Sequence, residues 1–179
     1  MEDAELIKIV SNMDSYILED DIRLYNKYVS RMMPGTTVLD VGTGLGKSAI
    51  GLSLANPEVQ VLTVDDGSAA FERGWAADQK GYEEKMKALF DSFGVKNCTF
   101  YFGDIFEMAF KNRIPYLDLF HLDDEALEAD ILEAMIPIIK INGIILMRNY
   151  NRCKDRVDQI CRGYKFLENM GLIQVIQKI

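Results

Sequence analysis

The residues best placed to do chemistry form a glycine-rich turn. Gly42, Gly44 and Gly46 follow the apolar run 37–41 directly, and Ser48 comes two residues later. Glycines at such positions let the backbone take positive φ and let a ligand approach the main chain closely. The turn therefore predicts a small-molecule site between a strand and a helix.

The spacing of the turn distinguishes three known patterns. The dinucleotide pattern GxGxxG requires glycine at position 47, which is Lys47. The phosphate loop GxxxxGK[ST] ends correctly at Ser48 but requires glycine at position 41, which is Val41. A third pattern, [DE]-x-G-x-G-x-G, fits Asp40 and the three glycines without a gap. A nucleotide hydrolase stays open as the weaker alternative, since residues 119–125 imitate the acidic strand that accompanies a phosphate loop.

Carboxylates recur at the ends of the other apolar runs. Asp65 lies 65 − 42 = 23 residues after Gly42, close to the spacing of about 20 at which a ribose-binding carboxylate is expected. A carboxylate suits that role because its two oxygens can accept both ribose hydroxyl hydrogens. Asp104 follows a third run and Asp123 ends a fourth. We expect these groups to meet around one ligand.

The elements that must position these groups alternate along the chain. The expected strands are Thr37–Val41, Val59–Asp65, Cys98–Phe102, Leu117–Leu122, Gly143–Arg148 and Leu172–Lys178. The expected helices are Ala4–Val10, Glu19–Met33, Lys47–Ala55, Tyr82–Phe93, Ala126–Ile139 and Lys154–Met170. This alternation predicts an α/β fold with a doubly wound, mostly parallel sheet and helices on both faces. Ligands of such sheets bind outside the carboxyl ends of the strands, at the point where the strand order reverses.

Taken together, five strand-end features in order across residues 35–150 resemble the class I S-adenosylmethionine-dependent methyltransferases. Gly46-Lys47-Ser48 is most similar to the small-molecule O-methyltransferases of the catechol and caffeoyl-CoA type. The resemblance implies a Rossmann-like fold and S-adenosylmethionine as cofactor, with Asp65 on the ribose, Asp104 on the adenine and Ser48 on the methionine carboxylate. The implied cofactor-binding residues are Asp40, Gly42, Thr43, Gly44, Gly46, Ser48, Asp65, Asp66, Gly103, Asp104, Ile105 and Asp123.

The resemblance also implies a division of the chain. Residues 1–34 would supply helices that cover the substrate, and residues 35–179 would form the cofactor-binding domain. Only one strand follows the last expected helix, whereas the family ends in a hairpin, so the sheet could lack its last strand. An open sheet edge invites pairing with another chain, which makes a homodimer an expectation.

The metal site of the catechol-type enzymes is where the resemblance ends. Those enzymes bind magnesium through an Asp after the fourth strand, matched by Asp123, and through an Asp-Asn pair, where this chain has Arg148-Asn149. A guanidinium beside a divalent cation is strongly repelled at contact distance. Their general-base lysine falls on Ala126. The sequence therefore predicts metal-independent methyl transfer to an oxygen or nitrogen of a small-molecule acceptor.

The catalytic candidates are Asp123, Arg148, Asn149 and His121, with Tyr150 as a further base. Arg148 would either pair with Asp123 or bind an anionic substrate.

Several of these residues also have a purely structural interpretation. Asp104 and Asp123 could each cap a helix, and Asp40 could tie the glycine loop by hydrogen bonds. His121 could be a hydrogen-bonded core histidine. A descendant of the family that has lost catalysis also stays open, because two of the expected chemical groups are absent.

Composition excludes several classes of function. The net charge of −8 disfavours nucleic acid as a partner. Three scattered cysteines form neither a disulfide framework nor a metal-binding pair, and a single histidine leaves little for zinc or Ser-His catalysis. The first ten residues do not resemble a signal peptide, and no apolar stretch is long enough to cross a membrane. We expect a cytoplasmic protein.

Overall fold

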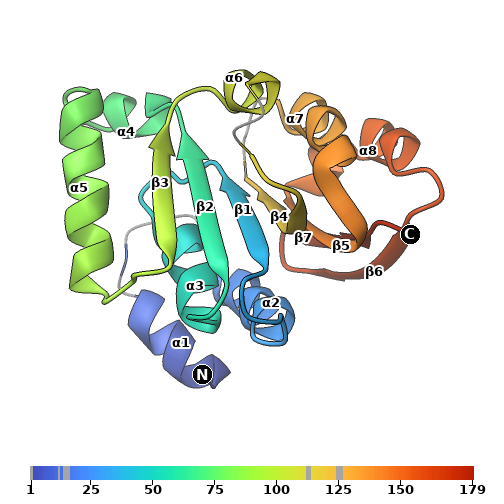
Figure 1. Cartoon of the computed structure of the whole chain (residues 1–179), viewed down its shortest axis with the longest axis horizontal. Coiled ribbons are helices and arrows are strands. Elements are labelled where there is room, and N and C mark those ends of the chain that lie inside the picture. The colour runs from blue at the N-terminus through green and yellow to red at the C-terminus, as the bar shows by residue number, and fades with distance from the viewer. Residues whose placement is uncertain (1, 12, 14–16, 112–113, 124–126) are drawn as a thin grey trace.

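A seven-stranded sheet forms the centre of the protein (Figure 1). The computed structural model describes residues 2–11, 13, 17–111, 114–123 and 127–179. The strands are β1 (Thr37–Val41), β2 (Gln60–Asp65), β3 (Cys98–Phe102), β4 (Leu117–Leu122), β5 (Ile139–Arg148), β6 (Lys165–Met170) and β7 (Ile173–Gln177). Their order is β3-β2-β1-β4-β5-β7-β6, and only β7 runs against its neighbours. The predicted doubly wound, mostly parallel sheet is confirmed.

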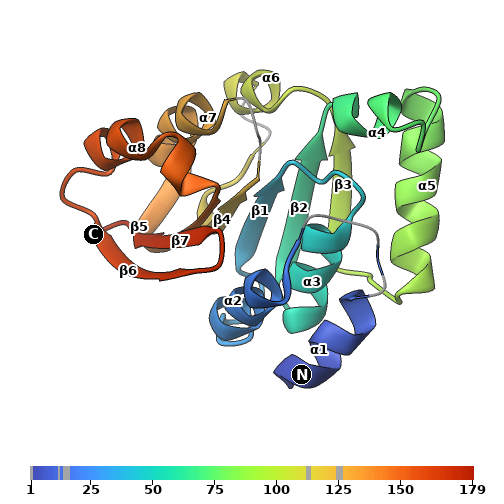
Figure 2. The same cartoon turned by 180° about the vertical axis from the view of Figure 1, so that it is seen from behind.

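Helices cover both faces of this sheet and bury two separate cores. The helices are α1 (Asp3–Val10), α2 (Glu19–Val29), α3 (Lys47–Ala55), α4 (Ser68–Glu72), α5 (Gln79–Ser92), α6 (Ile105–Phe110), α7 (Glu128–Met135) and α8 (Lys154–Ile160). One core joins side chains of α1, α2, α3 and α5, of which α1, α2 and α3 lie together in Figure 2. The other core joins α6, α7 and α8. Alternate residues of β1 point into the two cores, as the pleat of a strand requires.

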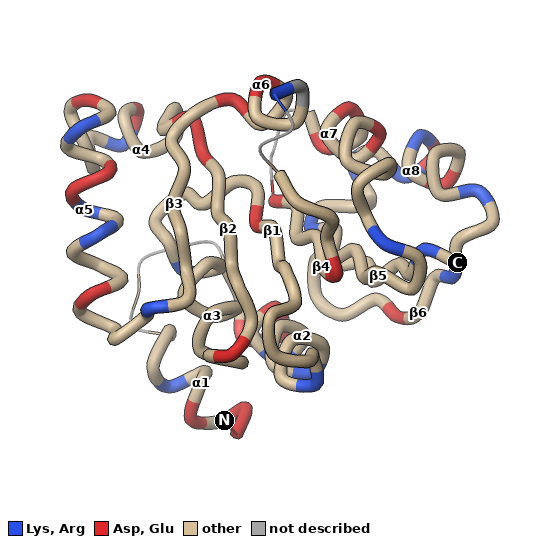
Figure 3. The backbone as a smooth tube through the Cα atoms, viewed as in Figure 1, with Lys and Arg blue, Asp and Glu red and all other residues tan. Residues whose placement is uncertain are grey.

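The charged residues lie mostly outside the sheet. The strands are mostly uncharged along their length, whereas blue and red alternate along the outer helix α5 (Figure 3). A parallel sheet covered on both faces can accept few charged side chains along its strands. Acidic residues occur at the carboxyl ends of β2 and β3, which is the edge of the sheet where ligands bind in this fold.

The C-terminal part of the chain differs from the prediction. The helix expected over Lys154–Met170 ends at Ile160, and the residues after Gly163 form β6, which pairs with β7 in an antiparallel hairpin. Gly163 has φ +91°, a backbone conformation that a helix continuing to Met170 could not contain. The last strand of the sheet is therefore present, and the prediction that it could be missing was wrong. The expected homodimer rested on that missing strand and stays a prediction.

Smaller differences occur around β5. The helix expected over Ala126–Ile139 covers only Glu128–Met135, and a 3₁₀ turn (Ile136–Ile138) leads into β5, which begins four residues before the expected Gly143. Pro137 lies in this turn and favours the end of the α-helix. None of the helices described is long and apolar enough to cross a membrane.

Candidate functional site

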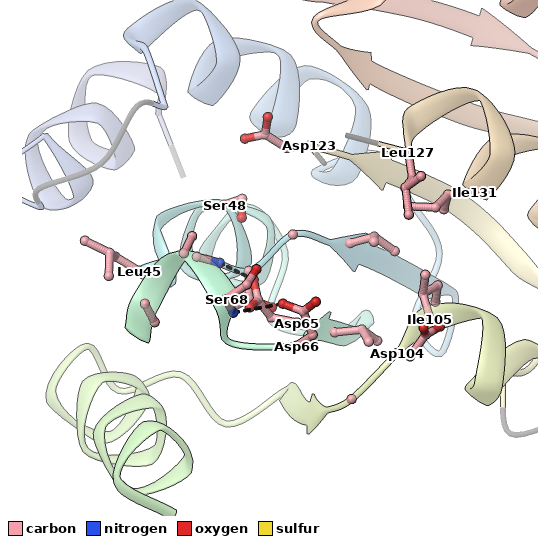
Figure 4. A pocket seen from close by; sticks show the side chains of 18 of the residues that line it. Leu45, Ser48, Asp65, Asp66, Ser68, Asp104, Ile105, Asp123, Leu127 and Ile131 are labelled. Carbon is pink, nitrogen blue, oxygen red and sulfur yellow. Dashed lines mark hydrogen bonds between the residues drawn. The ribbon is translucent and has the colours of Figure 1, made fainter. Parts of the chain in front are cut away.

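A cavity of about 450 Å³ lies at the carboxyl ends of β1, β2, β3 and β4 (Figure 4). It lies beside β1 and β4, where the strand order reverses, as the fold predicts. Of the predicted site residues, the cavity is lined by Gly42, Thr43, Gly44, Ser48, Asp65, Asp66, Gly103, Asp104, Ile105, Asp123 and Arg148. Asp40, Gly46, His121 and Asn149 do not line it.

The glycine loop has the backbone that its sequence predicts. Gly42, Gly44 and Gly46 have φ values of +88°, +52° and +87°. The amide of Gly42 extends the ladder by donating to the carbonyl of Val64 (3.0 Å), and the amide of Gly46 closes a tight turn on the carbonyl of Thr43 (2.8 Å). The loop then runs directly into α3, whose N-cap, Gly46, has no capping side chain. No capping side chain therefore competes with an anion at the N-terminus of α3, where the helix dipole favours negative charge.

Asp65 lies beneath this loop at the end of β2. Its carboxylate accepts the amide hydrogen of Gly44 at Oδ2 (2.8 Å) and that of Gly67 at Oδ1 (2.6 Å). Burial raises the pKa of Asp65 to about 6, although the two amides act to lower it. Each oxygen keeps a second lone pair. Asp65 therefore shapes the loop, and its carboxylate can still accept hydrogen bonds from a ligand.

Asp40 lies at the centre of a buried polar network. The register of the sheet places Asp40 of β1 beside Thr63 of β2 and His121 of β4. Its Oδ2 accepts hydrogen bonds from the hydroxyls of Thr63 (2.7 Å) and Ser48 (3.0 Å), and its Oδ1 lies 2.6 Å from Nδ1 of His121. The other ring nitrogen of His121 lies 3.0 Å from the hydroxyl of Tyr25 in α2. Asp40 thus ties the glycine loop to the sheet, one of the two roles predicted for it.

This network changes two of the predicted roles. His121 is fully buried with both ring nitrogens engaged, so its geometry is that of a core histidine rather than of a group facing the cavity. The hydroxyl hydrogen of Ser48 points to Asp40, so it is not available to a ligand carboxylate. The N-terminal end of α3, where the helix dipole favours negative charge, is the part of the helix that suits such a carboxylate.

A second buried cluster surrounds Arg148, the last residue of β5. Its Nη1 lies 3.0 Å and 3.2 Å from the two oxygens of Asp123, and its Nε lies 3.2 Å from Oδ2 of Asp21 in α2. Asp21 is fully buried, and the side chain of Arg148 is 4% exposed. Burial raises the pKa of Asp123, although the positive charge of Arg148 acts against this shift. Of the two alternatives for Arg148, the structure shows the pair with Asp123.

Two capping alternatives are also resolved. Asp104 caps α6, because its Oδ1 accepts the amide hydrogens of Phe106 (2.6 Å) and Glu107 (3.3 Å), while the residue also lines the cavity. Asp123 does not cap α7, whose N-cap is Leu127. Asn149 has φ +58°, and its Nδ2 lies 3.4 Å from Oδ1 of Asp123. The acidic residues 124–125 and Ala126, on which two sequence arguments rested, lie outside the described residues.

Some residues of the site could not be found from sequence. Asp21 and Tyr25 belong to α2, which precedes every motif, and the acidic start of that helix resembles an ordinary solvated first turn. Tyr82 of α5 donates a hydrogen bond to the carbonyl of Gly44 (2.6 Å). Ile17 also lines the cavity. No local signal marks these residues, because only the packing of distant elements brings them together.

The sequence also matches a known protein family. The sequence model of a methyltransferase domain matches residues 33–177. The chain belongs to this methyltransferase family. It is an enzyme whose methyl donor is S-adenosylmethionine, which confirms the predicted resemblance and decides against a nucleotide hydrolase. A comparison with curated proteins finds no match.

Solved structures of other methyltransferases share the fold. A methyltransferase from Geobacter sulfurreducens superposes with a TM-score of 0.72 at 17% identity, over 98% of this chain and 88% of that one. A protein provisionally assigned as a caffeoyl-CoA O-methyltransferase from Staphylococcus aureus gives 0.69 at 13% identity, over 98% and 90%. An rRNA methylase from Streptococcus thermophilus gives 0.63 at 13% identity, over 92% and 98%.

The cavity fits the cofactor of this family in three respects. Its volume lies in the range of about 300–1,000 Å³ that small-molecule sites occupy. The unused lone pairs of Asp65 match a pair of ribose hydroxyls, and the uncapped first turn of α3 matches a carboxylate. Carboxylates outnumber guanidiniums by five to two among the described lining residues, which suits a ligand that carries a sulfonium. The five carboxylates are those of Asp65, Asp66, Glu72, Asp104 and Asp123.

Proposed function

We propose that this methyltransferase acts on an oxygen or nitrogen of a small-molecule acceptor and does so without a metal ion. The observation that carries the proposal is the buried ion pair between Arg148 and Asp123, which lines the cavity. Arg148 occupies the place where metal-dependent relatives of the catechol type are expected to carry a carboxylate ligand.

The argument against a metal is electrostatic. A divalent cation bound to Asp123 would lie within a few ångströms of the guanidinium, which contacts both oxygens of that carboxylate. Two like charges at such distances in a partly buried site repel each other by several kcal/mol at an effective dielectric constant of about 20. Arg148 itself supplies the positive charge that stabilises Asp123. A metal ion would have to displace a side chain that Asp21 also holds.

The same cluster indicates the charge of the acceptor. The single positive charge of Arg148 faces the carboxylates of both Asp21 and Asp123. The cluster of these three side chains is therefore net negative when both carboxylates are ionised. It favours a neutral or cationic acceptor that donates a hydrogen bond, such as an alcohol, a phenol or an amine, over a carboxylic acid.

Methyl transfer requires only a few chemical roles of the protein itself. When bound, S-adenosylmethionine supplies a methyl group on a positively charged sulfur. The protein has to hold the acceptor in line with that methyl group and exclude water. Asp123 accepts the hydrogen bond of the acceptor's O–H or N–H group and takes up the proton, while Arg148 and Asn149 fix the orientation of its carboxylate. His121 is linked through hydrogen bonds by way of Asp40 to Ser48, at the start of α3. It therefore positions the glycine loop rather than the acceptor.

The N-terminal segment contributes one wall of this site. Ile17 lines the cavity, and Asp21 and Tyr25 of α2 reach the two buried clusters. We propose that residues 1–34 cover the acceptor, as the expected division of the chain implies. A small acceptor is favoured over RNA by the net charge of −8, although an rRNA methylase shares the fold. A cytoplasmic location is part of this proposal.

An acceptor screen tests the proposal. The formation of S-adenosylhomocysteine is measured with scaffolds that each carry an amine, a hydroxyl or a carboxylate at the same position, and with total tRNA and rRNA. Each assay is run with EDTA and with added magnesium. We expect turnover of an amine or hydroxyl compound that EDTA does not change and that D123N lowers by about 100-fold or more. Turnover only with RNA, only with carboxylates or only with magnesium would contradict the proposal.

A further inference from the structure

The glycine loop needs support from outside itself. Three residues with positive φ in five positions give a chain that is soft when free, because glycine has more conformational freedom than any other residue. The peptide groups of Gly44 are central, since this residue lines the cavity and its Cβ position is open space. Asp65 holds the amide hydrogen of Gly44 (2.8 Å). The carbonyl of the same residue has a different partner.

That partner is Tyr82, in the first half of α5. Its hydroxyl donates to the carbonyl oxygen of Gly44 across 2.6 Å. The next turns of α5 contact the loop as well, because a Cβ on Gly46 would lie 2.7 Å from Leu89 and 3.0 Å from Met86. The loop therefore rests on one face of α5, and Tyr82 makes the hydrogen bond of that contact.

The ring of Tyr82 is held firmly. It is fully buried, and four aromatic rings surround it. The ring lies edge to face with all four, with its centroid 5.1 Å from Phe100, 5.5 Å from Trp75, 6.1 Å from Phe71 and 6.3 Å from Phe102. Burial, the negative charge of Asp65 and a hydrogen bond to that carboxylate raise the pKa of Tyr82 far above its usual value, so the hydroxyl stays a hydrogen-bond donor.

We propose that Tyr82 is a positioning residue for the cofactor. It fixes the carbonyl side of Gly44 while Asp65 fixes the amide side, so that the loop has its ligand-binding shape before the ligand arrives. Preorganisation of this kind improves affinity by reducing the ordering that binding requires. Tyr82 lies behind the loop and outside the cavity lining, so it acts through Gly44 and the carboxylate of Asp65 and not by touching the ligand.

The test is the variant Y82F, which removes one oxygen and keeps the ring. We expect S-adenosylhomocysteine to bind about five- to tenfold more weakly by calorimetry at 25 °C, the effect of one lost hydrogen bond. Hydrogen exchange should rise in peptides that cover residues 42–48 and stay unchanged in β4 and β5. The matched control is Y28F, which removes a tyrosine hydroxyl bonded to Glu168, far from the loop. It should bind the ligand as the parent does.

Three outcomes would overturn the proposal. The first is a Y82F protein with a lower melting temperature and unchanged affinity, which would make the hydroxyl a stabilising group only. The second is unchanged exchange in residues 42–48. The third is loss of exchange protection throughout the sheet, which would show that Tyr82 acts on global folding and not on the loop.

Discussion

Replacing Asp65 by asparagine tests how the ribose of the cofactor is held. In D65N, one of the two oxygens becomes an NH₂ group, which cannot accept from Gly44 or Gly67, and the negative charge is lost. The variant therefore loses the charge-assisted hydrogen bonds expected to both ribose hydroxyls and one of its two backbone ties, to Gly44 or to Gly67. Hydrogen bonds to charged groups contribute about 1.5–3 kcal/mol each, so we expect a total loss of about 3–5 kcal/mol in binding free energy.

That loss corresponds to an affinity for S-adenosylhomocysteine that is lower by about two to four orders of magnitude. Titration calorimetry measures it, and circular dichroism establishes that the variant is folded. The matched control is D118N, because Asp118 also accepts a backbone amide hydrogen, that of Thr37 (2.9 Å), but at the opposite end of the sheet. We expect D118N to bind as tightly as the parent.

The result that would refute this reasoning is a folded D65N protein whose affinity lies within about threefold of the parent, which is less than one hydrogen bond to a charged group contributes. The ribose would then be held by other groups, and the role of Asp65 would be confined to the shape of the loop. Equal losses in D65N and D118N would point instead to a general effect of destabilisation.

Two further predictions concern the charged groups of the site. Burial raises the pKa of Asp65 to about 6 from its ordinary 3.8, and the ligand needs the ionised form of this carboxylate. The affinity for S-adenosylhomocysteine should therefore fall as the pH drops below 6, to about one-tenth of its full value at pH 5. A D65N protein should lack this pH dependence, and a flat profile in the parent would contradict the ribose-binding role of Asp65. The variant R148M leaves the carboxylates of Asp21 and Asp123 without their cation, so urea unfolding should show a loss of about 3–5 kcal/mol. The control is R156M, which removes two exposed ion pairs, to Asp130 and Glu133, and equal losses would refute the argument.

The sequence went furthest where local chemistry and local structure coincide. The strands Thr37–Val41, Cys98–Phe102 and Leu117–Leu122 and the helix Lys47–Ala55 were predicted with the bounds that the structure has. Buried parallel strands are short apolar runs, and the glycine loop has few alternatives, so the pattern determines the element. The positions of Asp65, Asp104 and Asp123 at strand ends followed from the same pattern.

Prediction from sequence did not extend to the C-terminal hairpin. The apolar residues of 154–170 fit a helical stripe, yet residues 165–170 form an edge strand because β7 offers them a partner. A short segment with mixed periodicity is decided by what it packs against, since propensity is weak compared with a ladder of hydrogen bonds. The same limit hid α4, a five-residue helix beside the cavity.

By itself, the sequence determined the family, the cofactor and the edge of the sheet where the site lies. These follow from glycines that permit a tight loop and from carboxylates placed at strand ends, which are properties of neighbouring residues. Only the tertiary structure decided which groups line the cavity and which lie behind them. The register of the sheet joined Asp40 to His121, and the packing of α2 and α5 brought Asp21, Tyr25 and Tyr82 to the site. Contacts between residues so far apart in the chain depend on the assembled core, which no local pattern records.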